Sequence, residues 1–407
     1  MAIITGYEQL YGPRFLIEAN DKFAQDLIPY VSRFEFEDDE AKFDTLKLTI
    51  ANPGFRFMND PRFKQGAKFR VRFGYLTDMS EMKSAIIAHA KPHYPEKEMP
   101  TIEMVAYSLQ TDINKTAHPV NYGRVASSDV ARVVAKRYNF DVDIEDSKDI
   151  RAQMRVQPAN MADIQYLLAL AGQLNWDFYI EGTKLHFHHK RYETPSTLEF
   201  KYFTDAKGTL LKFDPDVNMT SPPSTGVTSV NPKDGKTDSA GRAVPTKAAR
   251  QLLSNNRAKL GGVYFQNGPS ADPGTAFQHG TPEADPHVVA AHGAAGQQKI
   301  DMSAIKATAE VIGTPRVKAR MMIRISGVDS LYTGNWRVAS SQHTIDATGV
   351  YKTTAKLRRD AGASAKSQSS KSGDGSGEGA SGFGAPARQA LSNNRGRLTG
   401  VVFSGGK

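Results

Sequence analysis

Three histidines near the middle of the chain have the spacing that most suggests metal chemistry. His186 and His188 lie two positions apart in a predicted strand, so their side chains point to the same face, and His189 follows directly. A divalent ion in a protein needs three or four ligands, and these ligands need hydrogen bonds that orient them. The spacing of the sequence identifies no further ligand. We therefore predict three histidines on the surface of a strand, no metal site and no cofactor.

Two runs of acidic residues could also carry chemistry. Residues 141–146, Asp-Val-Asp-Ile-Glu-Asp, lack the glycine and the terminal glutamate of an EF-hand calcium loop. Residues 38–40, Asp-Asp-Glu, could supply a pair of carboxylates for acid–base catalysis. Both runs are more typical of solvated turns. The sequence also contains no cysteine, no P-loop, no Gly-x-Ser-x-Gly elbow and no His-Glu-x-x-His helix, so we predict no catalytic residue.

The elements that hold these residues begin with a run of short strands. Apolar and polar residues alternate over 31–37, 45–50 and 69–75, and turn residues separate these segments. Further strands are expected at 84–90 and 101–109. Strands that follow one another with no helix between them indicate an N-terminal antiparallel β-barrel over residues 1–112.

Residues 113–198 change to a helical period and form a predicted α/β module. One helix is expected to begin with Ser128 as its N-cap, and a second near Asn160 with Asp163 as its capping partner. A β-hairpin over 176–188 follows, with a glycine in its turn.

A second β-barrel is predicted from residues 199–213 together with 298–360. Its strands are expected at 306–312, 317–325, 336–340 and 351–357. Between its two parts lies an insertion, 214–297, whose proline and glycine density opposes regular helices and ladders. Residues 361–386 are expected to be a flexible linker. The predicted fold class is therefore β-rich α+β, with two antiparallel barrels around a small α/β module.

The charge of the chain is concentrated near its C-terminal end. The net charge is +9, and residues 298–407 carry +10 of it against −1 for the rest. Such a surface could bind the phosphates of a nucleic acid or an acidic protein. Few aromatic residues are interleaved with it, which weakens the case for a surface that stacks the bases of a single strand. The residues expected to form it are Arg316, Lys318, Arg320, Arg324, Lys356, Arg358 and Arg359.

One segment of the chain occurs twice. Residues 387–403 repeat residues 249–265 with 12 identities in 17 positions. The repeat is either a duplication without a function or a docking peptide whose two tethered copies raise avidity. As docking peptides, the copies would contact a partner through Arg250, Leu253, Asn255, Asn256, Arg257, Leu260 and Phe265, and through Arg388, Leu391, Asn393, Asn394, Arg395, Leu398 and Phe403.

The N-terminal residues show no basic stretch followed by an apolar one, and no segment approaches 18 apolar residues. We expect a soluble protein that is not exported by a cleaved signal and does not insert into a membrane.

Two sets of motifs resemble one known family. The helix and hairpin at 160–187 carry Asp163, Tyr166, Leu167, Leu170, Ala171, Phe178, Gly182, Leu185 and Phe187. A second set follows in Gly313-Thr-Pro, Tyr332-Thr-Gly-Asn-Trp336, His343-Thr-Ile345 and Gly349-Val-Tyr351. In their order these motifs resemble the phage late-control D protein family, the baseplate hub proteins of contractile tails, which are related to the N-terminal part of type VI secretion spikes. The chain departs from the family pattern in the length of 214–284 and in the residue inserted at Val350.

This resemblance implies a structural hub protein of a contractile phage tail or tail-like particle. Three chains would form a ring that connects the tail tube to the central spike and surrounds a channel. The implied partners are two further copies of the chain, the spike, tail-tube or tube-initiator proteins, baseplate wedge proteins and the tape-measure protein, and DNA would pass without sequence-specific binding.

The implied location is the tail baseplate of the virion, after assembly in the host cytoplasm. The basic residues would then face the channel or the spike. A tail-associated cell-wall hydrolase and a nucleic-acid-binding β-barrel module remain as alternatives.

Overall fold

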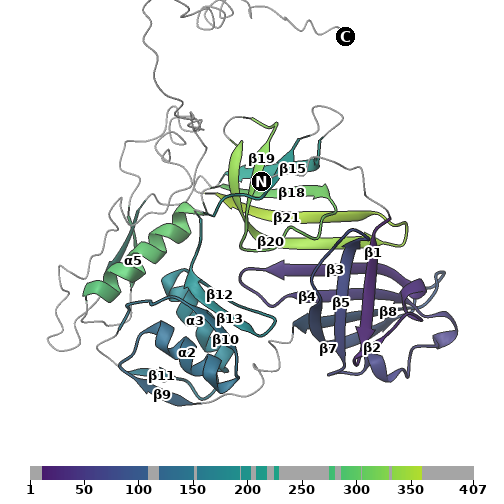
Figure 1. The fold of residues 1–407 in the computed structure, drawn as a ribbon, viewed down its shortest axis with the longest axis horizontal. Helices are drawn as coiled ribbons and strands as arrows, with labels where there is room; N and C mark the ends of the chain where they lie inside the picture. The colour runs from purple at the N-terminus through teal and green to yellow at the C-terminus, as the bar shows by residue number, and fades with distance from the viewer. Residues whose placement is uncertain are drawn as a thin grey trace, which may run out of the picture. The chain divides into compact units, whose positions relative to one another are not determined.

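The computed structural model describes residues 12–108, 119–150, 154–192, 194–202, 208–217, 224–228, 275–279, 286–303, 305–329 and 332–359. These residues belong to one compact unit, Met1–Ala365. They confirm the predicted fold class, because antiparallel strands dominate and helices are few (Figure 1). Along the described residues, none of the helices combines the length and the apolar character needed to cross a membrane. Both repeat copies lie outside the described residues.

The N-terminal strands enclose an aromatic core. In β4 every second residue, Leu46, Leu48 and Ile50, is fully buried, which is the period-2 pattern that predicted this strand. Phe34 and Phe73 contact each other across the core at 5.4 Å between ring centres. The strands are β1 (Arg14–Ala19), β2 (Lys22–Phe23), β3 (Val31–Asp39), β4 (Thr45–Ala51), β5 (Lys68–Tyr75), β6 (Asp78–Met79), β7 (Lys83–His93) and β8 (Thr101–Ser108), with short 3-10 turns at Ile28–Tyr30, Pro53–Phe55 and Pro61–Phe63.

The C-terminal strands enclose a second core around Trp336, which is fully buried. They are β14 (Leu198–Lys201), β15 (Leu210–Val217), β18 (Ile305–Ile312), β19 (Met322–Ser326), β20 (Gly334–Asp346) and β21 (Tyr351–Arg359). The strand expected at 317–325 begins only at Met322. The strand expected at 336–340 is instead 13 residues long.

This long strand joins the two sets of strands into one 14-stranded sheet. The second half of β20 pairs with β3, from Ser340 opposite Asp39 to Asp346 opposite Arg33. The sheet runs in the order β15-β18-β21-β20-β3-β4-β8-β7-β5-β1-β2, with β14, β19 and β6 beside this path. The two expected barrels are thus continuous with each other, while each side keeps its own core.

The α/β module packs two helices on one face of a three-stranded sheet. Val130 and Val134 of α2 and Leu167 and Leu170 of α3 are buried in one cluster with Phe187 of β13. The sheet has the order β10-β13-β12, in which β10 runs parallel to β13. The elements are β9 (Val120–Gly123), α2 (Ser127–Arg137), β10 (Asp141–Ile144), β11 (Arg155–Gln157), α3 (Asp163–Leu174), β12 (Trp176–Glu181) and β13 (Lys184–His189).

Both predicted helix caps are wrong. The N-cap of α2 is Ala126 rather than Ser128, and the Asp129 carboxylate accepts a hydrogen bond from the Ala126 amide at 3.1 Å. The N-cap of α3 is Ala162, and Asp163 is its first residue. Asp163 is instead a fully buried acceptor for the Tyr138 hydroxyl and the Gln157 amide. Serine and aspartate favour caps, but here tertiary hydrogen bonds use these side chains.

Part of the predicted irregular insertion is regular. Residues Pro286–Asp301 form helix α5, and β16 (Ser224–Thr228) pairs in parallel with β17 (Thr275–His279). The helix is compatible with the composition of its own residues, because Pro286 stands at its first position, where the missing amide hydrogen costs nothing.

Three residues of the C-terminal motifs, Gly313, His343 and Tyr351, are packing residues. Gly313 lies against the ring of Tyr351, so that a Cβ placed on Gly313 would be 2.1 Å from Tyr351 Cγ. His343 is buried between the Tyr351 hydroxyl at 2.9 Å and the Val317 carbonyl at 3.0 Å. Burial lowers the pKa of His343 to about 4, so this ring is neutral at physiological pH.

Candidate functional site

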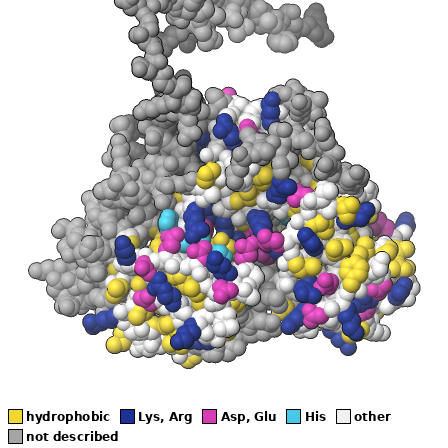
Figure 2. Space-filling model, in the orientation of Figure 1, with side chains coloured by type: hydrophobic (Ala, Val, Ile, Leu, Met, Phe, Trp, Pro, Cys, Tyr) yellow, Lys and Arg dark blue, Asp and Glu magenta, His cyan; other side chains and the backbone are white. Residues whose placement is uncertain are grey.

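The described part of the chain contains a cavity of about 650 Å³ where the N-terminal strands, the α/β module and the C-terminal strands meet. Its lining includes Asp38 of β3, Lys83 of β7, Tyr179 of β12 and Arg320 before β19. We call this region, together with the ion pairs of Arg337 described next, the junction. Figure 2 shows acidic and basic side chains gathered in the middle of this face.

Arg337 is the central charge of the junction. It is 2% exposed and lies on β20 between Trp336 and Val338. Its Nη2 donates to both carboxylate oxygens of Asp177 on β12, at 2.8 and 2.7 Å, and its Nη1 donates to the Arg320 carbonyl at 3.0 Å. Burial works to raise the pKa of Asp177, but the charge of Arg337 outweighs it and holds that pKa below its usual range.

Glu40 connects the N-terminal strands to the same group of charges. Its carboxylate lies 3.4 Å from Arg337 Nε, 3.5 Å from Lys190 Nζ and 2.7 Å from Arg358 Nη1. Glu40 was predicted to lie in a solvated turn with Asp38 and Asp39, and this prediction is wrong, because the Glu40 side chain is 5% exposed. The three parts of the chain therefore each supply charges to one buried network.

Arg320 makes a second set of contacts with the N-terminal strands. Its Nη1 donates to Asp38 at 3.1 Å, its Nη2 donates to the Asp39 carbonyl at 2.7 Å, and its guanidinium lies 4.6 Å from the ring centre of Tyr179. Its backbone φ is +70°, a conformation that side chains rarely adopt. The contacts of the guanidinium stabilise this strained backbone.

The predicted basic surface is largely paired within the chain. Arg316 pairs with Asp78, Lys318 with Glu81 and Glu181, and Arg324 lies 3.6 Å from Glu199. Arg320 and Arg358 pair with Asp38 and Glu40 as described above. Arg359 is 1% exposed and donates to the carbonyls of Tyr332 and Thr333, whereas Lys356 is exposed.

Asp177, Lys190 and Arg337 were not among the site residues predicted from the sequence. Arg337 carries no signal in the sequence, because an apolar, charged, apolar run is the ordinary alternation of a half-exposed strand. Its partners carry none either, since they lie 160 and 297 positions away in the sequence.

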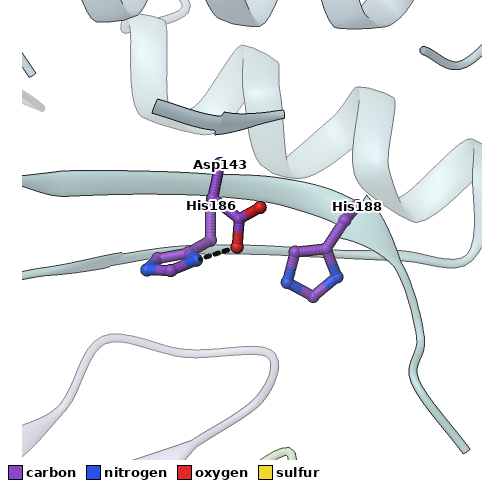
Figure 3. Close-up of side chains that lie close together, drawn as sticks. All are labelled: Asp143, His186 and His188. Carbon is purple, nitrogen blue, oxygen red and sulfur yellow. Dashed lines mark hydrogen bonds and ion pairs between the residues drawn. The ribbon is translucent and has the colours of Figure 1, made fainter. Parts of the chain in front are cut away.

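The histidine prediction also needs correction. His186 is 8% and His188 3% exposed, so neither lies on a strand surface. The acidic run at 141–146 is not a turn, because its first four residues form β10, which places Asp143 opposite His186. Figure 3 shows Asp143, His186 and His188 close together, with a hydrogen bond between the first two.

The fold is that of several solved tail proteins. The chain aligns with a tail protein from Neisseria meningitidis MC58 at a TM-score of 0.59 and 11% identity, over 86% of this chain and 97% of that one. It aligns with the 43 kDa tail protein of prophage MuSo2 from Shewanella oneidensis at 0.60 and 12%, over 86% and 98%. A chain of the Francisella PdpA-VgrG complex aligns at 0.51 and 9%, over 86% of this chain and 53% of that one.

These structural relatives are phage tail proteins and a protein of a VgrG complex, and at such identities the similarity is one of fold. A search of curated proteins found no match to the sequence. The chain belongs to the family described as the Alg8 N-terminal domain, whose model matches residues 40–347.

Substitution of Arg337 by methionine should strongly destabilise the protein. Asp177 and Glu40 would stay buried without their main counter-charge, which costs about 3–5 kcal/mol when one partner of a buried pair is removed. The measurement is the thermal unfolding temperature. Arg33→Met is the control, because that side chain is 56% exposed and pairs with Glu35 at the surface, where such pairs contribute about 0–1 kcal/mol. Equal unfolding temperatures for the two variants would contradict the central role of Arg337, whereas Arg337→Met/Asp177→Asn should recover part of the loss.

Asp44, which also lines the cavity, should make stability depend on pH. Burial, and then the negative charge of Asp38, raise the pKa of Asp44 from 3.8 to about 7. As the pH rises from about 4 to about 7, Asp44 of the folded protein keeps a proton that the unfolded chain has lost, so the free energy of unfolding falls. Asp44→Asn should therefore gain stability relative to the wild type between pH 4 and pH 8 in thermal unfolding. Asp21→Asn, at a side chain that is 76% exposed, should show no such trend, and a difference for Asp44→Asn that is constant with pH would refute the assignment.

Proposed function

We propose that this protein is a structural baseplate hub protein of a contractile phage tail or tail-like particle. Three copies would form a ring that connects the tail tube to the central spike. The observation that carries this proposal is the similarity of fold to two tail proteins over nearly their whole lengths. Membership of the late-control D proteins is part of the proposal and is supported by the two sets of motifs.

Those motifs have a structural explanation that favours the proposal. Asp163 is a buried acceptor between α3 and the segments around Tyr138 and Gln157, and Gly313 gives space to the ring of Tyr351. Asp163, Gly313, His343 and Tyr351 therefore serve the packing of this fold. Motifs of this kind accompany a shared architecture rather than a shared reaction.

The junction suits a protein that transmits force. Three parts of the chain share a network of buried charges that is satisfied only when they meet, because Arg337 pairs with both Asp177 and Glu40. The sheet that continues from β20 into β3 adds seven paired positions between the N-terminal and C-terminal strands. A rigid body of this kind suits an adaptor between a tube and a spike, and we propose no catalytic reaction for it.

The proposed assembly uses the division of the chain inferred from its sequence. Each subunit would supply two tube-like elements, one from residues 1–112 and one from residues 199–213 with 298–360. The six elements of three subunits would surround the channel. The proposed partners are the spike, tube or tube-initiator, wedge and tape-measure proteins. The proposed location is the virion baseplate, reached from the host cytoplasm. Of the predicted basic residues, Lys356 and Arg324 have exposed side chains that could face the channel or the spike.

The purified protein should form a homotrimer, with a mass three times the 44.5 kDa of the chain. Light scattering coupled to gel filtration, and cross-linking in isolated tails, measure this. The trimer should bind the spike protein encoded in the same particle, and a tube protein from an unrelated tail is the control. A monomer at every concentration, together with no affinity for the spike, would refute the hub proposal.

The repeat copies at 249–265 and 387–403 are proposed to be docking peptides for a protein of the same particle. A chain shortened by residues 381–407 should bind that partner more weakly, because one of two tethered copies is lost. The comparison is the dissociation constant of the full and shortened chains, with Leu391→Ala/Phe403→Ala in the full chain as a second variant. Equal affinities in all three would show that the second copy does no docking.

A further inference from the structure

Three potential metal ligands lie on one face of the α/β module. His186 and His188 alternate along β13, and the parallel pairing of β10 places Asp143 opposite His186. One nitrogen or oxygen from each residue lies within 4.8 Å of the others. Figure 3 shows all three side chains on the side of the sheet away from the helices.

His188 has a nitrogen that needs a partner. Its Nδ1 lies 2.8 Å from the His189 carbonyl, which can only accept, so Nδ1 carries the hydrogen and Nε2 carries a lone pair. Nε2 is buried and has no hydrogen-bond partner. Buried polar atoms without a partner are rare because each one costs free energy, and a metal ion would satisfy this nitrogen.

His186 and Asp143 form a ready pair of ligands. His186 Nδ1 lies 2.9 Å from an Asp143 carboxylate oxygen. Ligand atoms bound to a tetrahedral zinc ion at about 2.0–2.2 Å lie about 3.3–3.6 Å apart, so Nδ1, once its hydrogen has moved to Nε2, and the carboxylate oxygen already have nearly the required separation. The ligand atom of His188 lies within 4.8 Å of both and has to come closer. The Tyr179 ring stacks on His186 at 4.4 Å between ring centres and keeps the imidazole in place.

In the structure Arg191 lies where it would compete with a metal ion for the Asp143 carboxylate. Its Nη2 lies 3.4 Å from each carboxylate oxygen of Asp143 and 3.5 Å from Glu145. Its side chain is 47% exposed, so it can turn to Glu145 or to solvent when a metal replaces it. A cavity of about 150 Å³, lined in part by His188, Tyr179 and Asp177, leaves room for a water molecule as a fourth ligand.

We propose that Asp143, His186 and His188 bind one divalent transition-metal ion, with zinc as the expected metal. Two imidazoles and one carboxylate suit zinc, cobalt or nickel, whereas magnesium and calcium prefer oxygen ligands. The ion would tie β10 to β13 next to Tyr179 and Arg320 of the junction. It would therefore stabilise the three-stranded sheet of the α/β module.

The test uses the full chain, freed of metal with a chelator and then titrated with zinc by calorimetry and with cobalt(II) by visible absorption. We expect one ion per chain, cobalt bands typical of nitrogen and oxygen ligands, and a higher unfolding temperature with zinc. His188→Gln and Asp143→Asn should each weaken binding at least about tenfold. Both variants should unfold near the wild-type temperature without metal, which would show that they fold.

Two further variants complete the test. His189→Ala is the matched control, since this histidine is on the same strand but its ring pairs with Glu145, and it should bind zinc as the wild type does. Arg191→Ala should bind zinc more tightly, because the competing cation is gone. The proposal is overturned if zinc does not saturate at one per chain, if His188→Gln and Asp143→Asn bind as the wild type does, or if His189→Ala loses as much affinity as they do.

Discussion

The arrangement of the described chain depends on the burial of Arg337 between Asp177 and Glu40. A guanidinium that is 2% exposed needs counter-charges inside the protein, and these come from β12 and from the residue that follows β3. The network is complete only when the α/β module, the N-terminal strands and the C-terminal strands are all in place. A buried charge network adds little net stability compared with an apolar core, but it penalises every other arrangement of these parts.

The sheet and the junction act together. The long strand β20 carries Arg337 in its first half and pairs with β3 in its second half. The same strand therefore contributes to the C-terminal core, the charge network and the connection with the N-terminal strands. The strained backbone of Arg320, held by Asp38 and Tyr179, lies beside it. This concentration of constraints explains why the chain forms one compact unit up to Ala365 rather than separate barrels.

Much of the local structure could be predicted from the sequence. The alternation over Leu46, Leu48 and Ile50 identified β4, and the glycine at 182 marked the turn of the hairpin, where its φ is +59°. The caps of α2 and α3 could not be predicted, because the Ser128 hydroxyl accepts from the Ser147 amide and Asp163 accepts from the Tyr138 hydroxyl, 19 and 25 positions away. The length of β20 was missed for a related reason: its second half alternates weakly and is stabilised by pairing with β3, a strand some 300 positions earlier in the chain.

The candidate site, too, could be predicted from the sequence only in part. The sequence by itself determined that His186 and His188 share a face, that the C-terminal part is basic and that the chain is β-rich with an α/β module, because these properties follow from spacing, composition and periodicity. Only the tertiary structure decided that Asp143 completes a group with the two histidines, and that Glu40 and Asp177 neutralise Arg337. The physical reason is that parallel pairing and the meeting of distant strands bring together residues whose separation in the sequence carries no information about their distance in space.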